Sequence, residues 1–218
     1  LSYSSGFRAP QAFDEDMHIE NVGGTVAMIE RAKDLKEEKS QSFSVSADMY
    51  HRFGAFQTNL LIEGFYTRLT DVFVLGKPYD RGDGILVKTR SNGPGAKVMG
   101  LTLEGKVAYL SILQIQAGLT LQRSRYDEPH KWHDDAPAEK KIFRTPDTYG
   151  YFTATCTPIK PLSIALSGTY TGRMLVQRMD ITAENAELGK MPERKAEAIR
   201  TPRFFDLGVK LAYDFKLY

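Results

Sequence analysis

The sequence predicts an all-β protein, and more specifically an antiparallel up-and-down β-barrel that crosses a membrane. Long segments alternate apolar and polar residues with a period of two, which indicates strands with one apolar and one polar face. The breaks between these segments are alternately very short and very long. Tight turns at one rim and long loops at the other rim are typical of outer-membrane barrels.

The last segment shows the alternation most clearly. Its odd-numbered positions from Leu207 to Leu217 are aliphatic or aromatic, whereas Asp206, Lys210 and Asp214 occupy even-numbered positions. Successive side chains of a strand point to opposite faces of its sheet. We therefore expect one aliphatic and aromatic face, formed by Phe43, Val45, Leu113, Ile115, Leu119, Ile164, Leu207, Val209 and Leu211.

Counting these segments predicts eight membrane crossings. Short breaks fall near 51–55, 108–111 and 157–161, and the long excursions cover 8–38, 71–84, 127–144 and 174–201. The crossings are expected near residues 1–7, 39–52, 55–71, 85–108, 111–126, 145–157, 161–173 and 202–218.

Two segments allow more than one structural interpretation. The crossing at 85–108 contains Asn92-Gly93-Pro94-Gly95, which we interpret as a bulge or kink. A full turn there would place the short connection at 108–111 at the rim of the long loops, away from the other tight turns. The segment 27–39 admits a short helix, but its charge run at 31–39 favours a solvated surface.

Composition limits the classes of function. The 218 residues carry 29 basic and 27 acidic side chains, a balance that gives no support to a nucleic-acid partner. The mean hydropathy of −0.35 suits a barrel, because only every second strand residue faces lipid. No apolar run approaches the ~18 residues of a transmembrane helix. Cys156, the single cysteine, excludes an intrachain disulfide and a cysteine-rich zinc site.

A soluble β-sandwich also alternates, so strand length must decide. Strands of globular proteins are usually ~5–6 residues long, whereas membrane strands need ~9–11 residues to cross. Several segments here run to a dozen or more residues, and aromatic residues gather at their ends. This pattern favours the membrane barrel.

The first half of the chain carries motifs of a known family. Residues 3–10, Tyr-Ser-Ser-Gly-Phe-Arg-Ala-Pro, resemble the strand-to-loop signature in the barrels of TonB-dependent outer-membrane receptors. Residues 35–40 resemble the Leu-x-Pro-Glu-x-Ser entry into the family's next strand, with Glu37 at the position where proline is usual.

Two further motifs follow in the family's order. Residues 64–72 resemble an aromatic strand end that precedes an external loop, and residues 92–100 match an Asn-x-x-x-Ala-x-x-x-Gly strand. The family's usual glutamate after that glycine is replaced by Thr102, and Glu104 follows two positions later. Each motif alone is weak, but their order and spacing together make the resemblance specific.

The resemblance implies where the chain belongs in a receptor. Such barrels have 22 strands and a plugged lumen. The motif order implies about strands thirteen to twenty, so residues 1–218 are expected to form one partial barrel domain. The plug domain, its TonB-contacting segment and the final hairpin are then expected outside the chain. The expected location is the outer membrane of a Gram-negative bacterium.

No catalytic constellation is found, so the sequence predicts a protein that is not an enzyme. Ligand contacts are expected in the external loops, at Asp14, Asp16, His18, His130, Trp132 and His133. His130-x-x-His133 has some metal-ligand character, but a solvated polar loop is the favoured interpretation.

The family resemblance bears on one of these residues. His18 lies where haem-transporting members carry a ligand histidine, but their companion Asn-Pro-Asn-Leu element is replaced by Ala-Lys-Asp-Leu at 32–35. The glycine-rich segment 80–84 is expected to form a tight turn rather than a calcium loop. Neither a bound metal nor a cofactor is predicted.

The resemblance implies a receptor and transporter for TonB-dependent uptake of a scarce nutrient. An iron–siderophore chelate, haem, a corrinoid and a glycan all remain open as its ligand. The alternatives are a passive porin or adhesin-like barrel, and a soluble carbohydrate-binding β-sandwich. Expected partners are the extracellular ligand, the TonB complex through the plug, and outer-membrane lipid. The chain alone is expected to self-associate, because its edge strands and apolar face lack partners.

Overall fold

The structure is a computed structural model that describes residues 1–10, 27–76, 79–82, 86–132, 136–181 and 194–215. Within these ranges the chain forms strands and no helix. The long strands make one antiparallel sheet whose order follows the sequence, and β10 joins it by pairing with β9. Its strands are β1 (Ser2–Arg8), β3 (Glu38–Phe53), β4 (Phe56–Thr70), β8 (Ala96–Tyr109), β9 (Leu113–His130), β10 (Glu139–Lys141), β11 (Thr148–Ile159), β12 (Leu162–Thr171) and β15 (Phe204–Tyr213).

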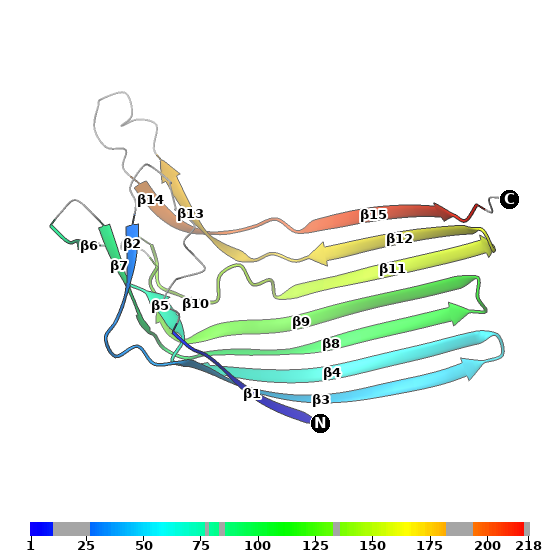
Figure 1. Cartoon of the computed structure of the whole chain (residues 1–218), viewed down its shortest axis with the longest axis horizontal. Coiled ribbons are helices and arrows are strands. Elements are labelled where there is room, and N and C mark those ends of the chain that lie inside the picture. The colour runs from blue at the N-terminus through cyan, green and yellow to red at the C-terminus, as the bar shows by residue number, and fades with distance from the viewer. Residues whose placement is uncertain (11–26, 77–78, 83–85, 133–135, 182–193, 216–218) are drawn as a thin grey trace.

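Two small sheets stand at one end of the long strands, on the left of Figure 1. The tight turns lie at the opposite end, on the right. We call these the loop end and the turn end. One small sheet contains β2 (Ala27–Arg31), β5 (Phe73–Leu75), β6 (Tyr79–Asp80) and β7 (Leu86–Asn92), and the other contains β13 (Leu175–Ile181) and β14 (Arg194–Arg200).

Apart from β10, the main sheet contains eight strands, and these correspond to the eight predicted crossings. The short connections at Gly54, Leu110 and Lys160 join neighbouring strands at the turn end, as predicted. Gly54 and Leu110 both have positive φ angles, 56° and 49°, so each of these turns uses a left-handed residue. The sheet stays open, with β1 and β15 as its outermost strands.

The predicted fourth crossing at 85–108 is wrong in its first part. Only β8 belongs to the main sheet, while β7 leaves it and pairs with β2 and β5. The side chain of Asn92 explains why β7 leaves the main sheet, because it forms hydrogen bonds with two other segments. Its Oδ1 accepts from the Lys36 backbone N–H at 2.8 Å, and its Nδ2 donates to the carbonyl oxygens of Lys36 and Asp71. The kink is therefore a junction between two sheets.

Neighbouring strands explain the alanine and the glycine of the Asn-x-x-x-Ala-x-x-x-Gly motif. Ala96 is 1% exposed and stands between Leu69 and Tyr126 on the neighbouring strands. A Cβ at Gly100 would come within 2.6 Å of the Phe65 ring, so only glycine leaves that ring its place.

The short helix admitted for 27–39 is not formed. β2 instead runs parallel to β7, with Ala27 opposite Leu86 and Arg31 opposite Arg90. The pairing supplies backbone hydrogen-bond partners that a short, highly charged helix would have had to provide alone. In the glycine-rich segment after β6, the Gly82 N–H donates to Asp80 Oδ1 at 2.7 Å, and residues 83 and 84 of the predicted turn lie outside the described residues.

The register confirms the predicted apolar face. Leu113, Cys156, Ile164 and Leu211 stand opposite one another across four strands, and the other predicted residues lie on this same face. Most of these side chains are exposed, up to 75% for Val209, whereas Leu113 and Cys156 are half-buried. No described segment covers this face as a second layer, so the sheet is not a sandwich. We call it the apolar face, and the opposite one the lumen face.

The lumen face carries the cross-strand hydrogen bonds between side chains. Ser42 bonds Thr67 at 2.8 Å and Thr102 bonds Thr120 at 3.0 Å. Gln116 Nε2 donates to Glu104 and to Tyr151. Polar residues line the lumen of such barrels, because water rather than lipid fills it.

Candidate ligand-binding site at the loop end

The sheet β2–β7–β5 is tied to the main sheet by contacts around Phe73. The Phe73 N–H donates to Glu38 Oε2 at 3.1 Å, and the guanidinium of Arg8 lies 5.5 Å from the centre of the Phe73 ring. Together with Asn92, these contacts fix the start of β3 beside the small sheet. All four family-like motifs contribute residues to this group of contacts. Their order in the sequence therefore corresponds to a set of contacts in the fold.

The external part of β9 positions the first group of candidate contacts. β9 runs on past the start of β11 and ends at His130, which stands opposite Glu139 of β10. The rings of His130 and Tyr126 are 5.5 Å apart. Tyr126 occupies an even-numbered position of β9 and belongs to the lumen face, and the pairing of β9 with β10 shifts register between Arg125 and His130. Trp132 follows the strand and meets Phe143 edge-on at 6.3 Å between ring centres.

Burial gives two of these side chains unusual acidities. Burial lowers the pKa of the His130 imidazole from its usual 6.5. Burial, and secondly the negative charge of Glu38, raises the pKa of Tyr126 above 10.0. At neutral pH the pair is therefore an uncharged imidazole beside an uncharged phenol. Such groups donate and accept hydrogen bonds without carrying a net charge.

A second feature of the loop end is a cavity of about 720 Å³. It lies where β9 continues beyond its last pairing with β11 and where β10 and the β13–β14 hairpin approach. Its lining residues are Gln122, Arg123, Ser124, Arg125, Glu139, Lys140, Lys141, Asp147, Leu175, Ala198 and Arg200.

Cations outnumber carboxylates in this cavity, five to two. Lys141 pairs with Asp147, and Gln122 Nε2 donates to the carbonyl of Pro146 at 2.9 Å. Ser124 is 1% exposed, and its Oγ has no hydrogen-bond partner within the described part of the chain. The excess of cationic side chains suits an anion, although the Ser124 side chain points to the face opposite to Arg123 and Arg125.

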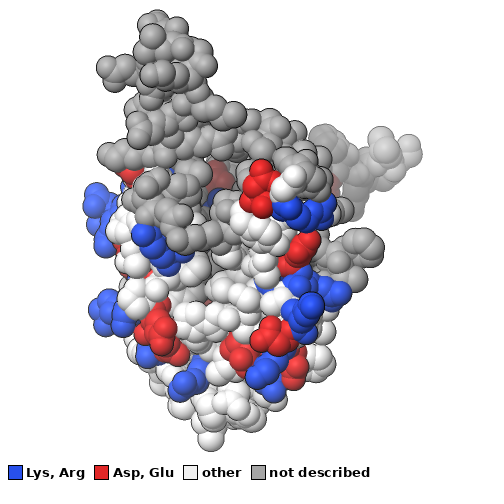
Figure 2. All heavy atoms as spheres, turned by 90° about the vertical axis from the view of Figure 1, so that its left-hand side faces the viewer, with Lys and Arg blue, Asp and Glu red and all other residues white. Residues whose placement is uncertain are grey.

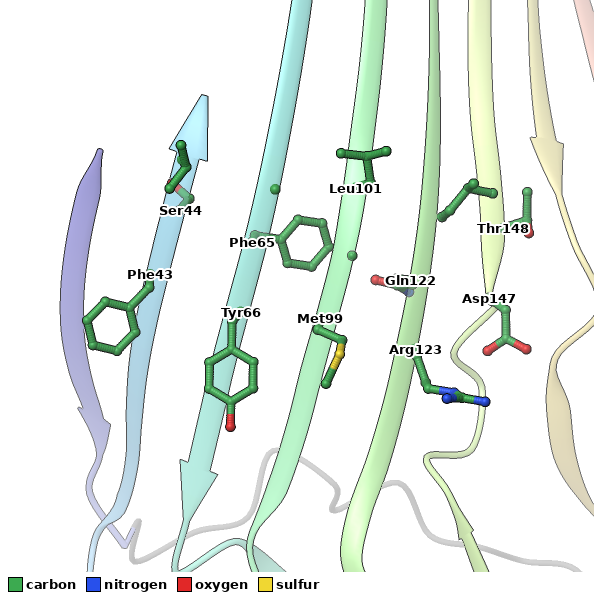
Figure 3. Close-up of a pocket in the computed structure, with 14 residues that line it drawn as sticks. Phe43, Ser44, Phe65, Tyr66, Met99, Leu101, Gln122, Arg123, Asp147 and Thr148 are labelled. Carbon is green, nitrogen blue, oxygen red and sulfur yellow. The ribbon is translucent and has the colours of Figure 1, made fainter. Parts of the chain in front are cut away.

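A shallower depression of about 870 Å³ lies further along the main sheet (Figure 3). It is lined from β3, β4, β8 and β9 and by the beginning of β11, and its lining is mainly apolar. Gly64 contributes open space, because a Cβ there would meet nothing within 4 Å. Without a convergent set of polar groups, this depression is a poor candidate for selecting a nutrient.

Acidic and basic side chains are interspersed over the loop-end surface (Figure 2).

Of the six residues predicted as ligand contacts, the structure describes His130 and Trp132. His130 ends β9 and Trp132 lies in the β9–β10 connection, and their ring partners are Tyr126 and Phe143 rather than each other. Asp14, Asp16, His18 and His133 lie outside the described residues.

Neither a metal centre nor a spanning helix is found in the segments that the structure describes. No group of three or more histidine, cysteine and acidic side chains there is arranged to hold a metal ion. No helix there is long and apolar enough to cross a membrane. Cys156 is a free thiol on the apolar face.

The model of the β-barrel family described as "TonB dependent receptor-like" matches residues 1–218. The chain belongs to this family. Barrels of TonB-dependent receptors are outer-membrane proteins of Gram-negative bacteria. No curated protein sequence matches the chain.

Solved structures of other TonB-dependent receptors share the fold at low sequence identity. The FrpB iron transporter from Neisseria meningitidis superposes with a TM-score of 0.59 at 16% identity, and the alignment covers 97% of this chain and 29% of that one. The copper transporter OprC gives 0.56 at 11%, covering 98% and 28%. The ferric enterobactin receptor from Pseudomonas aeruginosa gives 0.54 at 15%, covering 84% and 24%. The chain spans less than a third of each.

Sequence reasoning missed Tyr126 and the cationic cavity. A signal for the cavity existed in the alternating Arg123-Ser124-Arg125 and in Lys140-Lys141. The contribution of Arg200 had no local signal, because it comes from β14, which is distant in the sequence.

Proposed function

We propose that this TonB-dependent receptor barrel takes up a metal ion or metal chelate across the outer membrane. The match of the family model to the whole chain carries the proposal. The printed names of the three structural neighbours speak of iron, copper and ferric enterobactin. Because those chains are more than three times longer, we further propose that strands and a plug outside residues 1–218 complete the barrel and contact TonB.

The ligand is proposed to contact the part of β9 that extends beyond the membrane, around Tyr126 on the lumen face. His130 and Tyr126 stand there side by side, and Trp132 lies just after the strand. The remaining contacts are proposed at Asp14, Asp16, His18 and His133 in the external loops. Loops held on a rigid sheet are common places for recognition, because the sheet fixes their ends.

Uptake by the whole receptor tests the proposal. A strain lacking the parent gene is complemented with the wild-type gene, and accumulation of radiolabelled iron and copper, free and chelated, is measured. We expect one of these substrates to accumulate only when both the receptor and TonB are present. Entry of many small solutes without TonB would instead identify a passive porin.

Matched variants then test the contact residues. His130→Ala combined with Tyr126→Ala should weaken ligand binding by whole cells. Lys106→Gln, on the lumen face of β8 within the membrane span, should leave binding unchanged. Binding that is lost equally in both proteins would contradict the placement of the site.

A further inference from the structure

The pairing of the central strands places four basic side chains in one row across the apolar face. Arg68 stands opposite Lys97, Lys97 opposite Arg125, and Arg125 opposite Lys141. We call these four residues the basic row. Like charges directly opposite one another on adjacent strands are destabilising. The fold itself therefore gives no reason for collecting them.

Only two of the four side chains of the basic row pair with carboxylates of described residues. Lys97 pairs with Asp127 at 3.2 Å, and Lys141 pairs with Asp147. The side chains of Arg68 and Arg125 are exposed and make no ion pair with a described residue. Arg123, one step closer to the turn end on the same face, is likewise exposed.

The row lies at a defined depth relative to lipid. Two aromatic belts bound the apolar face, one including Phe53, Phe56 and Tyr109, and the other including Phe43 and Tyr66. Ten residues separate Phe43 from Phe53 along β3, which is ~34 Å of strand, or ~26 Å along the membrane normal at a tilt of ~40°. This matches the ~25 Å apolar band of such barrels.

The basic row begins immediately outside that band. Arg68 is two residues beyond Tyr66, and Lys97 is two residues before Met99, each on the loop-end side of the belt. Tyr66 and Met99, each two residues from the basic row, also line the depression in Figure 3. A molecule with acyl chains against the apolar face would therefore hold its head group at the level of the basic row.

Guanidinium groups suit phosphate, because they bind phosphate oxygens through paired hydrogen bonds. Arg123 and Arg125 lie on the apolar face of β9, and both line the adjoining cavity together with Lys141. We propose that the basic row, together with Arg123, binds the phosphate groups of an anionic glycolipid in the outer leaflet.

The test uses the full-length receptor in detergent and a purified bis-phosphorylated acyl glycolipid, with its enzymatically dephosphorylated form as second probe. Arg68→Gln combined with Arg125→Gln should weaken binding of the phosphorylated lipid about tenfold or more, because each cation near anionic head groups adds to affinity. Binding of the dephosphorylated form should already be weak in the wild type and should not change.

The control variant removes the same charge from the opposite face. Lys106→Gln combined with Lys210→Gln should bind the phosphorylated lipid as the wild type does, since both residues lie on the lumen face. All variants are first checked for folded barrel by heat-dependent electrophoretic mobility. Unchanged affinity in the Arg68 and Arg125 variant, or an equal loss in the control, would overturn the proposal. Displacement of the lipid by excess inorganic phosphate at matched ionic strength would also overturn it, in favour of a soluble anion.

Discussion

The ring of Tyr151 lies across the backbone of Gly118, its cross-strand partner on the lumen face. A Cβ added at Gly118 would stand 2.5 Å from one carbon of that ring. From this position the Tyr151 hydroxyl accepts a hydrogen bond from Gln116 at 2.9 Å, and Gln116 also donates to Glu104 at 2.7 Å. The missing side chain at Gly118 therefore allows a polar network to cross three strands.

Gly118→Val should displace the Tyr151 ring and break its hydrogen bond with Gln116. Forcing a side chain into an occupied space typically costs ~1–3 kcal/mol. The measurement is urea unfolding of the full-length receptor in lipid vesicles. Gly105→Val is the matched control, because a Cβ there meets nothing within 4 Å. Equal stability of the two variants would show that Tyr151 moves aside freely.

The facing of the last strand gives a second prediction. Val209 is on the apolar face and 75% exposed, whereas Lys210 is on the lumen face. Val209→Arg in the full-length receptor should destabilise the inserted barrel by ~2–4 kcal/mol if the site lies near the bilayer midplane. Lys210→Ala should cost far less. Equal tolerance of both changes in a vesicle-refolding equilibrium would contradict the assigned faces.

These faces were predictable because alternation is a local property. A strand such as β15 shows its two sides in its own sequence, and the register then aligns residues such as Leu113 and Leu211 that are far apart. The error at 85–108 has the opposite cause. Asn92 holds Lys36 and Asp71 through its side chain, and no local pattern reports such distant partners.

The candidate site was predictable only in part for the same reason. His130 and Trp132 were identifiable as polar and aromatic loop residues, whereas the Tyr126 ring beside His130 depends on the extension of β9 past β11. The cationic cavity unites β9, β10 and β14, whose proximity follows from the fold and not from spacing.

Topology at the two ends gives a third prediction. The connection between β9 and β10 is at the loop end, and Pro137 within it is exposed. An epitope tag inserted after Pro137 should bind antibody on intact cells. A tag inserted after Lys160, in the turn between β11 and β12, should bind only after permeabilisation. The reverse labelling would place the loop end in the periplasm.

The acidity of His130 gives a fourth prediction. Burial lowers its pKa in the folded protein, whereas the unfolded chain binds the proton near pH 6.5. Below pH 6.5 the unfolded state therefore binds more protons, so folding stability falls as the pH decreases towards the lowered value. Hydrogen exchange of the full-length receptor should speed up in β9 near His130 between about pH 7 and pH 5.5.

His130→Gln is the control for this effect, since its amide does not titrate. Exchange in this variant should lose its additional pH dependence after correction for the intrinsic exchange rate. If hydrogen exchange near His130 stays equally slow over this pH range in the wild type, protonation of His130 does not control the stability of this part of β9.

The open edges of the sheet give the last prediction, for residues 1–218 produced alone. The N–H of Asp214 donates to the carbonyl of Pro161, and Tyr213 stands opposite Leu162. In an antiparallel ladder this geometry turns the N–H of every second residue, Leu211 included, away from β12. Among the described residues, β15 therefore presents unpaired donors along an edge whose apolar side chains are exposed, a template for pairing with another copy.

We expect this chain to sediment as dimers or larger assemblies in detergent-free buffer. Leu211→Pro should reduce edge-to-edge assembly, because it removes one outward donor while sparing the bonds to β12. Lys210→Pro is the contrast, since its N–H faces β12 and its loss should weaken the sheet itself. Assembly that persists unchanged in Leu211→Pro would indicate burial of the apolar faces against each other. A dilute, monodisperse monomer with a cooperative melt would show that the chain covers its own apolar face.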